Sequence, residues 1–393
     1  MKFNSYKISD LISEIAMGPF GSNIKVDCFV DYGIPVLNGS NLDGFELKED
    51  SFRFITEEKA NSLKRANAYR GDVVITHRGT LGQIIYIPVT SQYDRYVISQ
   101  SQFRLRCNEK ILPEYFVHYF HTKVGQYQLL SNASQVGVPA LARPTSTFQR
   151  LVIVIPEIEI QKKIVNILSM LQSKIKINQQ INENLERQAQ TIYQQVFPYT
   201  ISDDLPPGWR IGTVGEIIEV HDSKRIPLSG SVRGKMEKKI YPYYGAASLM
   251  DYVDDYIFDG KYLLLGEDGT VVDAAGFPIL QYVWGKFWVN NHAHILTGKL
   301  GFNVESLYLL FKQTPVKSIV TGAVQPKISQ ANLRSIQIVI PPELVILSVN
   351  DQINPLFSQM RLNEDQNKVL VTLRDTLLPK LMSGEIDVSN IQL

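Results

Sequence analysis

Apolar residues recur at alternating intervals of four and three positions along two long stretches of the chain, at about 157–197 and 342–384. This spacing places the apolar side chains on one stripe of an α-helix and is typical of a coiled-coil seam. The first seam contains Ile164, Leu168, Leu171, Ile175, Asn178, Asn182, Leu185, Ala189, Ile192 and Val196. The second seam contains Val349, Ile353, Leu356, Met360, Asn363, Asn367, Leu370, Arg374, Leu377 and Leu381. The pattern predicts two helices of about 41 residues, each about 60 Å long.

A constant offset relates the two seams, since adding 185 to each number of the first seam gives the second. The same offset relates "IVIP" at 153–156 to "IVIP" at 338–341, and self-similarity of this kind predicts an internal duplication. The segment "DLPPGWR" marks the boundary between the copies, because its prolines and glycine interrupt regular structure. We therefore expect five parts, namely a globular domain at 1–156, a long helix at 157–199, a second globular domain at 200–341, a second long helix at 342–384 and a tail at 385–393.

The remainder of each copy predicts a mixed globular domain. Short β-like runs such as "DVVIT", "QIIYI" and "KYLLL" are separated by Gly and Asn turns, and each copy holds one further helical segment, "PEYFVHYFHTKVGQYQLL" or "VESLYLLFKQ". The predicted fold class is α+β, with two mixed α/β globular domains, each followed by a long helix. The two long helices are expected to pair as an antiparallel coiled coil.

Two asparagines four positions apart interrupt each seam near its centre, Asn178 and Asn182 in the first copy and Asn363 and Asn367 in the second. In an antiparallel pairing Asn178 would face Asn367, and the other two asparagines would face each other. An unpaired buried amide costs about 1–3 kcal/mol, so polar seam residues penalise slipped registers. We expect the asparagines to set the helix register and thereby the distance between the globular domains. The alternatives are that they face solvent or a third surface, and Arg374 in the second seam could snorkel or face a partner.

Composition indicates a globular protein with a balanced surface, because hydrophobic residues make up 44%, charged residues 20%, and Lys+Arg 40 stand against Asp+Glu 39. Only two cysteines occur, and "MKFNSYKISD" lacks the features of a signal peptide. We therefore expect a cytoplasmic protein. No apolar run approaches the ~18–20 residues needed to cross a bilayer, so no membrane association is expected.

Catalytic signatures are not found in the sequence. None of the four Gly-Lys dipeptides is followed by Ser or Thr, so no phosphate-binding P-loop is predicted. Glu267 and Asp268 are not followed two residues later by the lysine that a nuclease motif would need. His118 and His121 lie on a predicted apolar helix, and His292 and His294 alternate on a β-like run with no cysteine or carboxylate cluster nearby in the sequence. Both patterns favour structural positions over metal ligation.

Basic and amide-rich loops are the strongest binding candidates. The stretch "HDSKRIPLSGSVRGKMEKK" concentrates positive charge in a nearly neutral protein and suits contacts with phosphates. Weaker candidates in the first copy are "GPFGSNIK", "THRGT" and "ISQSQ", whose amides and cations could read base edges. The alternative for each of these segments is an ordinary solvated loop.

With these features the chain resembles the specificity subunit of type I restriction–modification enzymes over its whole length. The resemblance is carried by the starts "YKISDL" and "WRIGTV", by "FWVNNHAHIL", by "TGAVQPKISQANLRSIQIVIP" and by "LRDTLLPKLMSGEIDV". It implies two target-recognition domains, at 1–156 and 200–341, that each read one half of a split DNA sequence and are held apart by antiparallel spacer helices. The first helix departs from the pattern, because it ends in "QQVFPYTI" without the Lys-Leu-Met-Ser-Gly-Glu tail.

The resemblance also implies partners. These are double-stranded DNA, two modification subunits that carry S-adenosylmethionine and the methylating site, and, in hosts that have one, a restriction subunit that uses ATP and Mg. The chain itself is expected to hold no cofactor and to be a non-catalytic recognition subunit. Because the loops of the two copies differ, the half-sites should differ and the target should be asymmetric.

The sequence also leads us to expect particular residues to contact DNA. For the upstream half-site we expect Ser22, Asn23, Lys25, His77, Arg78 and Gln100 to contact DNA. For the downstream half-site we expect Lys224, Arg225, Arg233 and Lys235, with Asn290, Asn291 and His292 nearby. Two other classes of function stay open from the residues, an autonomous DNA-modifying enzyme with an unrecognised active site and a structural dimer whose helices pair between chains.

Overall fold

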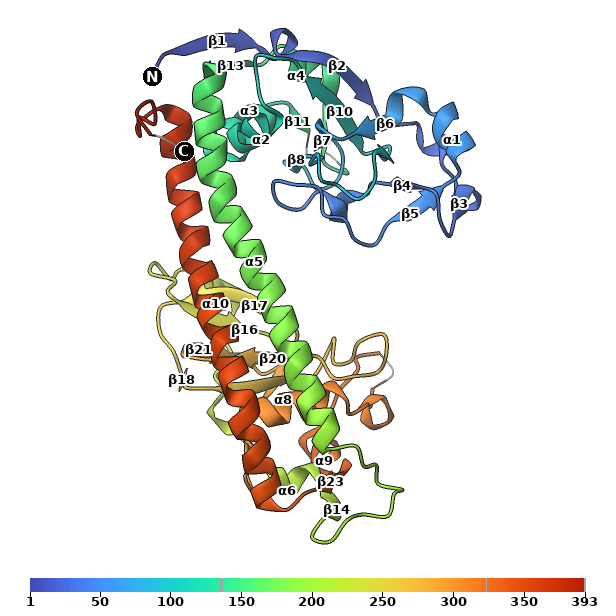
Figure 1. Ribbon diagram of the computed structural model, residues 1–393, viewed down its shortest axis with the longest axis vertical. Coiled ribbons are helices and arrows are strands. Elements are labelled where there is room, and N and C mark those ends of the chain that lie inside the picture. The colour runs from blue at the N-terminus through green and yellow to red at the C-terminus, as the bar shows by residue number, and fades with distance from the viewer. Residues whose placement is uncertain (135–136, 323, 392–393) are drawn as a thin grey trace. The chain divides into compact units, whose positions relative to one another are not determined.

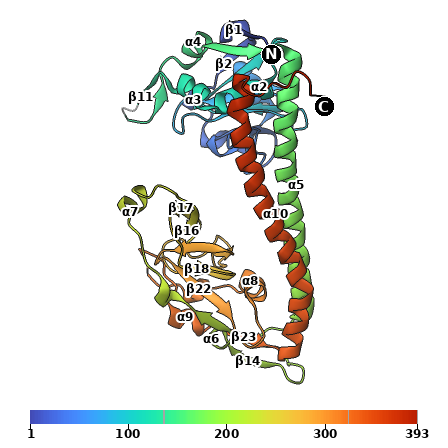
Figure 2. The same ribbon diagram turned by 90° about the vertical axis from the view of Figure 1, so that its left-hand side faces the viewer.

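The computed structural model describes residues 1–134, 137–322 and 324–391, except for the side chain of Ser22. The chain forms two compact units, the first comprising Met1–Lys176 with Asn367–Leu393 and the second comprising Ile177–Gln366. Each unit therefore combines one globular part with segments of both long helices (Figure 1, Figure 2).

The first unit is built around an antiparallel sheet with the order β2 (Ile12–Met17), β10 (Gln102–Cys107), β7 (Asp72–Thr76) and β8 (Ile84–Tyr86). A mixed sheet has the order β3 (Phe29–Val30), β5 (Arg53–Ile55), β4 (Ile34–Val36), β9 (Arg95–Val97) and β6 (Asn67–Tyr69). Two ribbons pair β1 (Phe3–Lys7) with β13 (Val152–Pro156) and β11 (Ala133–Ser134) with β12 (Ala140–Leu141). The short helices are α1 (Glu57–Ser62), α2 (Pro113–His121), α3 (Lys123–Leu130) and α4 (Pro144–Gln149), with 3₁₀ turns η1 (Ile8–Asp10), η2 (Gly21–Asn23), η3 (Val26–Cys28), η4 (Gly39–Asn41) and η5 (Lys64–Ala66).

The second unit repeats this plan. Its antiparallel sheet has the order β15 (Ile218–Val220), β22 (Ala293–Gly298), β19 (Tyr262–Gly266) and β20 (Leu280–Val283). A mixed sheet has the order β17 (Leu249–Val253), β16 (Tyr241–Tyr244), β21 (Lys286–Val289) and β18 (Phe258–Asp259), and β14 (Arg210–Thr213) pairs with β23 (Gln337–Ile340). The short helices are α6 (Val214–Ile217), α7 (Gly230–Gly234), α8 (Val304–Lys312) and α9 (Gln330–Arg334), with η6 (Asp222–Lys224) and η7 (Lys317–Ile319).

The duplication predicted from the sequence is therefore present in the topology, and the predicted fold class is confirmed. The sheet β15-β22-β19-β20 has the same strand order and antiparallel pairing as β2-β10-β7-β8. The mixed sheets differ between the units, which agrees with the divergence of the two sequences in these segments.

Burial on both faces explains why the central strands are apolar throughout. In β7, Val73 and Ile75 face a cluster that contains Phe116 of α2, whereas Val74 faces a separate cluster with Val97 of the mixed sheet. A strand covered on both sides has no solvent face and does not need polar residues at alternate positions. The equivalent strand β19 is divided between two clusters in the same way.

The two long helices are α5 (Ile158–Val196) and α10 (Glu343–Ser383). In the first unit, Leu168 near the start of α5 shares a core with Leu381 near the end of α10. In the second unit, Tyr193 near the end of α5 shares a core with Ile353 near the start of α10. The helices therefore run antiparallel within each unit, as predicted (Figure 1).

The seam shifts by one position where the helices also contact a globular part. The predicted seam residues Ile192 and Leu356 are only partly buried, whereas their neighbours Tyr193 and Phe357 are buried in a cluster that includes Leu309 of α8. A straight helix has 3.6 residues per turn, so a stripe with a period of 3.5 drifts, and a second packing partner decides which neighbour is buried.

Arg374 occupies its seam position by packing against the first globular part. Its guanidinium lies over the ring of Phe45, 5.0 Å from the centroid, and donates to Gln172 Oε1 at 2.9 Å. The attraction between a cation and an aromatic face offsets part of the free energy of hydration that the cation loses on burial. This seam position therefore tolerates arginine.

The four seam asparagines are buried, so the solvent-facing alternative is wrong. Asn363 Nδ2 donates to Asn182 Oδ1 at 2.8 Å, the pairing expected for antiparallel helices. Asn182 Nδ2 in turn donates to the carbonyl oxygen of Met360 at 3.1 Å, and Asn178 Nδ2 donates to Gln366 Oε1 at 2.8 Å. Their role in setting the register stays a prediction.

We expect Asn363→Ala to lower the free energy of unfolding of the second unit by about 1–3 kcal/mol, because Asn182 Oδ1 would lose its donor in a buried position. All three tryptophans, Trp209, Trp284 and Trp288, belong to the second unit, so urea titration followed by tryptophan fluorescence measures this change. Exposed Leu362 on the same helix supplies the control Leu362→Ala. If Asn363→Ala is no more costly than the control, the amide pair is not a specific contact.

Candidate nucleic-acid interface

Residues predicted to read the upstream half-site gather at one end of the antiparallel sheet of the first unit. Strands β2 and β7 end there and β10 begins there, so the loops that hold Asn23 and Lys25, His77 and Arg78, and Gln100 meet. The ring nitrogen Nε2 of His77 lies 3.1 Å from the carbonyl oxygen of Gln100. The sheet thus joins three segments that are far apart in the sequence.

Accessible polar groups remain in this cluster. The side chains of Asn23, Lys25, Arg78 and Gln100 are exposed, whereas that of Ser22 lies outside the described part of the structure. Burial lowers the pKa of His77, so its ring is neutral at physiological pH and offers a hydrogen bond rather than a charge.

Gly21 allows the β2 loop to lie directly against the loop that precedes β10. A Cβ atom at this position would come within 2.1 Å of Gln100 Oε1. A larger residue would therefore push Gln100 away from its place in the cluster.

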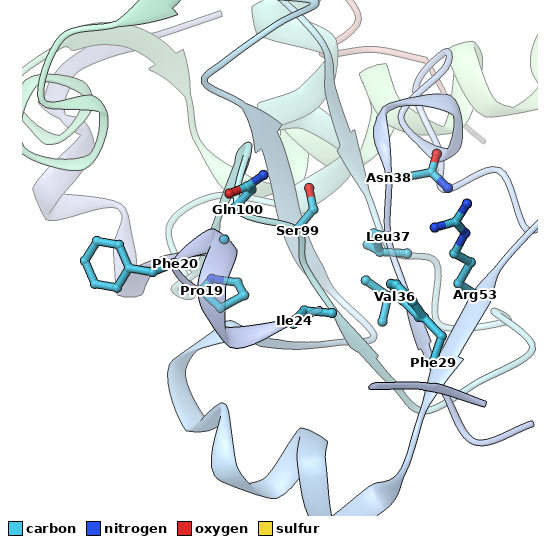
Figure 3. A pocket seen from close by; sticks show the side chains of 11 residues that line it. Pro19, Phe20, Ile24, Phe29, Val36, Leu37, Asn38, Arg53, Ser99 and Gln100 are labelled. Carbon is cyan, nitrogen blue, oxygen red and sulfur yellow. The ribbon is translucent and has the colours of Figure 1, made fainter. Parts of the chain in front are cut away.

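A pocket of about 360 Å³ opens beside this cluster, between the β2 loop and strands β4 and β5 (Figure 3). Its apolar lining includes Phe29 and Ile24, and its polar lining includes Asn38, Arg53 and Gln100. The Arg53 guanidinium lies 5.2 Å from the centroid of the Phe29 ring. The pocket therefore offers a flat face and several hydrogen-bonding groups next to the predicted DNA-reading loops.

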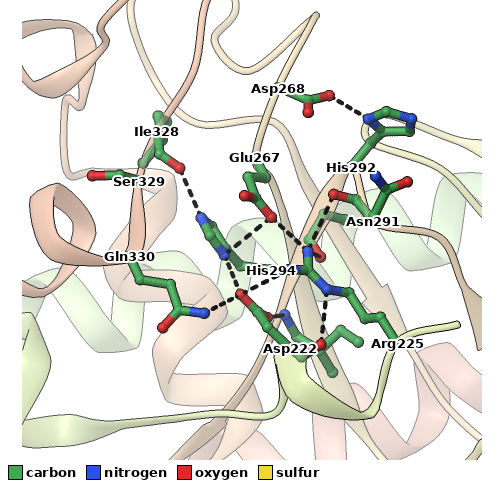
Figure 4. A network of polar contacts seen from close by, with 12 residues as sticks. Asp222, Arg225, Glu267, Asp268, Asn291, His292, His294, Ile328, Ser329 and Gln330 are labelled. Atoms are coloured by element: carbon green, nitrogen blue, oxygen red, sulfur yellow. Dashed lines mark hydrogen bonds and ion pairs between the residues drawn. The ribbon is translucent and has the colours of Figure 1, made fainter. Parts of the chain in front are cut away.

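The second unit presents its downstream candidates at the equivalent sheet end. Strands β15 and β19 end there and β22 begins there. The loops concerned hold Asp222–Arg225, Glu267 with Asp268, and Asn290–His292, as Figure 4 shows. Lys224, Arg225 and Asn290–His292 therefore occupy loops that correspond to those of the first unit, whereas Arg233 and Lys235 lie at α7, farther along the chain.

A buried network of charges organises this second end (Figure 4). Asp222 accepts hydrogen bonds from His294 Nδ1 at 2.6 Å, from Gln330 Nε2 at 2.6 Å and from the backbone N–H of Ile295 at 2.9 Å. Arg225 donates to Glu267 Oε2 at 2.5 Å. These bonds connect the loops after β15 and β19, strand β22 and the start of α9.

Both ring nitrogens of the buried His294 have partners in this arrangement. Its Nδ1 faces the carboxylate of Asp222, and its Nε2 lies 2.8 Å from the carbonyl oxygen of Ile328. The two ring nitrogens therefore connect η6 to the segment that precedes α9.

The network keeps both carboxylates ionised. Burial alone would raise the pKa of Asp222, but the hydrogen bond and positive charge of His294 outweigh it, so the pKa lies below its usual range. Burial likewise opposes ionisation of Glu267, and the hydrogen bond from Arg225 with nearby positive charges lowers its pKa.

The same residues have the chemistry of a metal cluster, since ligand atoms of Asp222, Glu267 and His294 lie within 4.8 Å of one another. Protein cations already occupy the positions between them, however. Arg225 bonds Glu267, and Lys327 Nζ lies 3.2 Å from Glu267 Oε1. The carboxylates of the cluster thus pair with cationic side chains of the protein itself.

The structure separates the downstream candidates into two groups. Lys224, Lys235 and Asn291 are exposed. Arg225, Arg233, Asn290 and His292 are engaged within the protein. The first group is available for direct contacts and the second group shapes the loops.

Each engaged residue has an identifiable partner. Arg233 pairs with Asp251, with Nε 3.1 Å from Oδ2, and lies over the ring of Tyr243. His292 Nδ1 lies 2.5 Å from Asp268 Oδ1, and Asn290 Oδ1 accepts from the backbone N–H of His292 at 2.8 Å.

Sequence reasoning missed several members of these sites. Gln330 and Lys327 are distant in sequence from the basic stretch, and Asn38 and Arg53 lie in segments without a distinctive motif. No sequence motif identifies these four residues, because only strand pairing and loop packing bring them to the sheet end. The acidic pair at 267–268 was considered only as a nuclease signature, whereas it supports the loop network.

The geometry defines a duplicated binding protein with one polar loop cluster in each repeat. The family model for the type I restriction modification DNA specificity domain matches residues 4–187 and 206–349. The chain belongs to this family. Specificity subunits are the non-catalytic DNA-recognition components of type I restriction–modification enzymes, and this chain is one of them.

Individual relatives agree with this assignment. The chain is 24% identical to the type I restriction enzyme MjaIX specificity subunit of Methanocaldococcus jannaschii, over 98% of this chain and 94% of that protein. It is 33% identical to a putative specificity subunit, S.HindORF215P, of Haemophilus influenzae over 37% of each chain. The crystal structure of the S subunit from M. genitalium has a TM-score of 0.58 at 15% identity and covers 97% of this chain and 96% of that one, which shows a shared fold. Among the described residues, no helix is long and apolar enough to cross a membrane.

Proposed function

We propose that the two equivalent sheet ends read the two halves of a bipartite, asymmetric DNA target. The observation that supports this proposal best is the correspondence of the loops, because the loops after β2 and before β10 hold candidates of the first copy, and the loops after β15 and before β22 hold Lys224, Arg225 and Asn290–His292 of the second. Residues 1–156 and 200–341 are then the two target-recognition domains. The helices at 157–199 and 342–384 are the spacer that fixes the distance between the half-sites.

Different chemistry at the two ends supports an asymmetric target. The first end offers neutral His77, the amides of Asn23 and Gln100, and the pocket lined by Phe29 and Arg53. The second end offers Lys224 and Asn291 beside a network of ion pairs, and Lys235 follows α7 in the connection between β15 and β16. Cations position phosphates, and amides discriminate base edges by bidentate hydrogen bonds.

The chemistry of methylation belongs to partners in this proposal. Two modification subunits that bind S-adenosylmethionine assemble with the chain on double-stranded DNA. A restriction subunit that uses ATP and Mg joins where the host has one. This chain supplies the target sequence to which their activities are directed.

Salt dependence of DNA binding tests the proposal. We expect the double variant Lys224→Ala/Lys235→Ala, assembled with the modification subunits, to bind target DNA more weakly. Each lost phosphate contact lowers the slope of log affinity against log salt by about 0.9, so two contacts lower it by about 1.8. Fluorescence anisotropy with labelled duplex at several salt concentrations measures the slope.

Lys299 gives a matched control. It is exposed and follows β22, at the opposite end of the strand from Asn291. Lys299→Ala should leave the slope unchanged. An equal slope for the double variant and the wild type would remove these lysines from the interface.

A further inference from the structure

The outward face of strand β13 is unexpectedly apolar. Val152 and Val154 alternate with buried Ile153 and Ile155, and they remain 45% and 48% exposed. In a ribbon with one face in water, the outward positions are normally polar. Exposed valines at both positions indicate a surface that another apolar segment covers.

A groove surrounds these valines, and we call it the β13 groove. It has a volume of about 910 Å³, and its lining is largely apolar. Phe3, Val124, Val152, Val154, Leu378 and Met382 form its apolar floor and walls. Lys123 and Asp375 lie on its lining as charged groups, the pattern of an apolar centre with a polar rim that is common at protein interfaces.

The internal duplication supplies an equivalent groove in the second unit. The offset of 185 relates Val154 to Val339 and Leu378 to Tyr193, and both equivalents line a pocket of the second unit. This second pocket has a volume of only about 320 Å³. Val339 is also half-buried, whereas Val154 is exposed.

A segment of the chain itself lines this second pocket. After α5, residues 198–201 run back along the second pocket and contribute to its lining. The ring of Tyr199 lies 5.1 Å from that of Trp209, and Trp209 lies 5.6 Å from Phe197. An aromatic-rich segment therefore lines the pocket of the second repeat, whereas residues 384–386, at the same offset after α10, do not line the β13 groove.

The residues that follow α10 take a different path. Gly384 has a φ of +79°, and a Cβ there would come within 2.7 Å of the Phe3 ring. The chain turns at this glycine, and Val388 inserts into the core of the first unit. Among the described residues after α10, no aromatic side chain lines the β13 groove as Tyr199 lines the equivalent pocket.

We propose that the β13 groove docks a short segment of a modification subunit, with an aromatic ring followed closely by a branched aliphatic residue. Such a segment takes in trans the place along the groove that Tyr199 and Ile201, which line the equivalent pocket, take in cis in the second repeat. This proposal rests on the proposed function, which makes the modification subunit a partner. It also implies that two modification subunits meet unequal surfaces, so the subunit that docks at the first repeat binds more tightly.

Binding of the purified modification subunit to the full-length chain tests this inference. Val154→Asp and Val124→Asp each place a charge in the groove at an exposed position, so neither disturbs a buried core. We expect either variant to weaken the tighter of two binding steps by about 30-fold or more, as for a residue central to an interface, and to leave the weaker step unchanged. Native mass spectrometry and sedimentation measure the two steps.

Val89→Asp is the matched control, since Val89 is exposed in the first unit and does not line the groove. Unchanged binding of both groove variants would overturn the docking proposal and leave the proposed function intact. Failure of the wild-type chain to bind any modification subunit would instead overturn the proposed function. Self-association of the wild-type chain that Val154→Asp abolishes would identify a second copy as the occupant and overturn the proposal.

The covering segment gives a second, independent measurement. Tyr199→Ala should open the second pocket and raise the affinity of the weaker step, because the partner segment no longer competes with the chain. An unchanged weaker step would contradict the equivalence of the two grooves.

Discussion

Asp222→Ala is expected to abolish recognition through the second unit. The substitution leaves His294, Arg225 and Gln330 around a buried site without their central acceptor. Removing one partner of a buried ion pair costs about 3–5 kcal/mol. A cost of about 3 kcal/mol corresponds to roughly a 100-fold decrease in the ratio of molecules with a correctly formed site to those without one. Sequencing of methylated bases in cells that carry the variant complex measures the result as loss of methylation at the bipartite target.

Acid should reproduce the effect of the substitution. The pKa of Asp222 is lower in the folded chain than its usual value of 3.8, so the unfolded chain takes up the proton more readily. The stabilisation of the folded state by the ionised Asp222 carboxylate is complete above pH 3.8. It is lost as the pH falls through the lower pKa that Asp222 has in the folded chain. Asp222→Ala should therefore flatten the acid dependence of tryptophan-monitored unfolding in this window.

Exposed Asp259 provides the control for both measurements. Asp259→Ala should retain methylation at the target and the acid dependence of the wild type. Normal methylation by the Asp222→Ala complex would show that the network does not support DNA reading.

Glu305→Ala is expected to destabilise the attachment of the second globular part to helix α10. The Glu305 carboxylate is fully buried, and it accepts from Lys261 Nζ at 2.5 Å, from the Tyr282 hydroxyl at 2.8 Å and from Arg361 of α10 at 3.1 Å. Its removal leaves a partly buried guanidinium without its counter-charge, so we expect a loss of about 3–5 kcal/mol in the free energy of unfolding. Urea titration followed by tryptophan fluorescence measures it.

Two variants make this measurement specific. Glu219→Ala removes an exposed carboxylate from β15 of the same unit and should change the unfolding free energy little. Arg361→Met removes the charge from the helix side, and its cost should not add fully to that of Glu305→Ala, because residues of one ion pair are coupled. Full additivity would mean that the pair does not connect the helix to the globular part.

The two repeats use one scaffold with different chemistry at the sheet end that holds the candidate loops. Phe103 pairs with Ile75 in the first sheet, and His294 pairs with Leu265 at the corresponding position of the second. Phe103 packs against Phe148, with ring centroids 5.4 Å apart, whereas His294 joins a network of charges. The strands thus keep their pairing while the groups that shape the loops diverge, which supports unlike half-sites.

Sequence alone determined the repeated architecture and the antiparallel helix pair. Heptad spacing, the offset of 185 residues and the recurring asparagine pairs depend on periodicity, which is a local property of the chain. Even the contact between Asn182 and Asn363 followed from register, because a continuous helix transmits phase along its length.

Only the tertiary structure decided which polar residues are available for DNA. Arg225 and Lys224 are neighbours in the same basic stretch, yet Arg225 bonds Glu267 and Lys224 is exposed. Likewise, Arg53 and Gln100 line one pocket although 47 positions separate them. The sequence shows that a cationic residue is present. Which residue it pairs with depends on the strand pairing between distant segments. That pairing is a property of three-dimensional packing and not of the neighbouring residues in the chain.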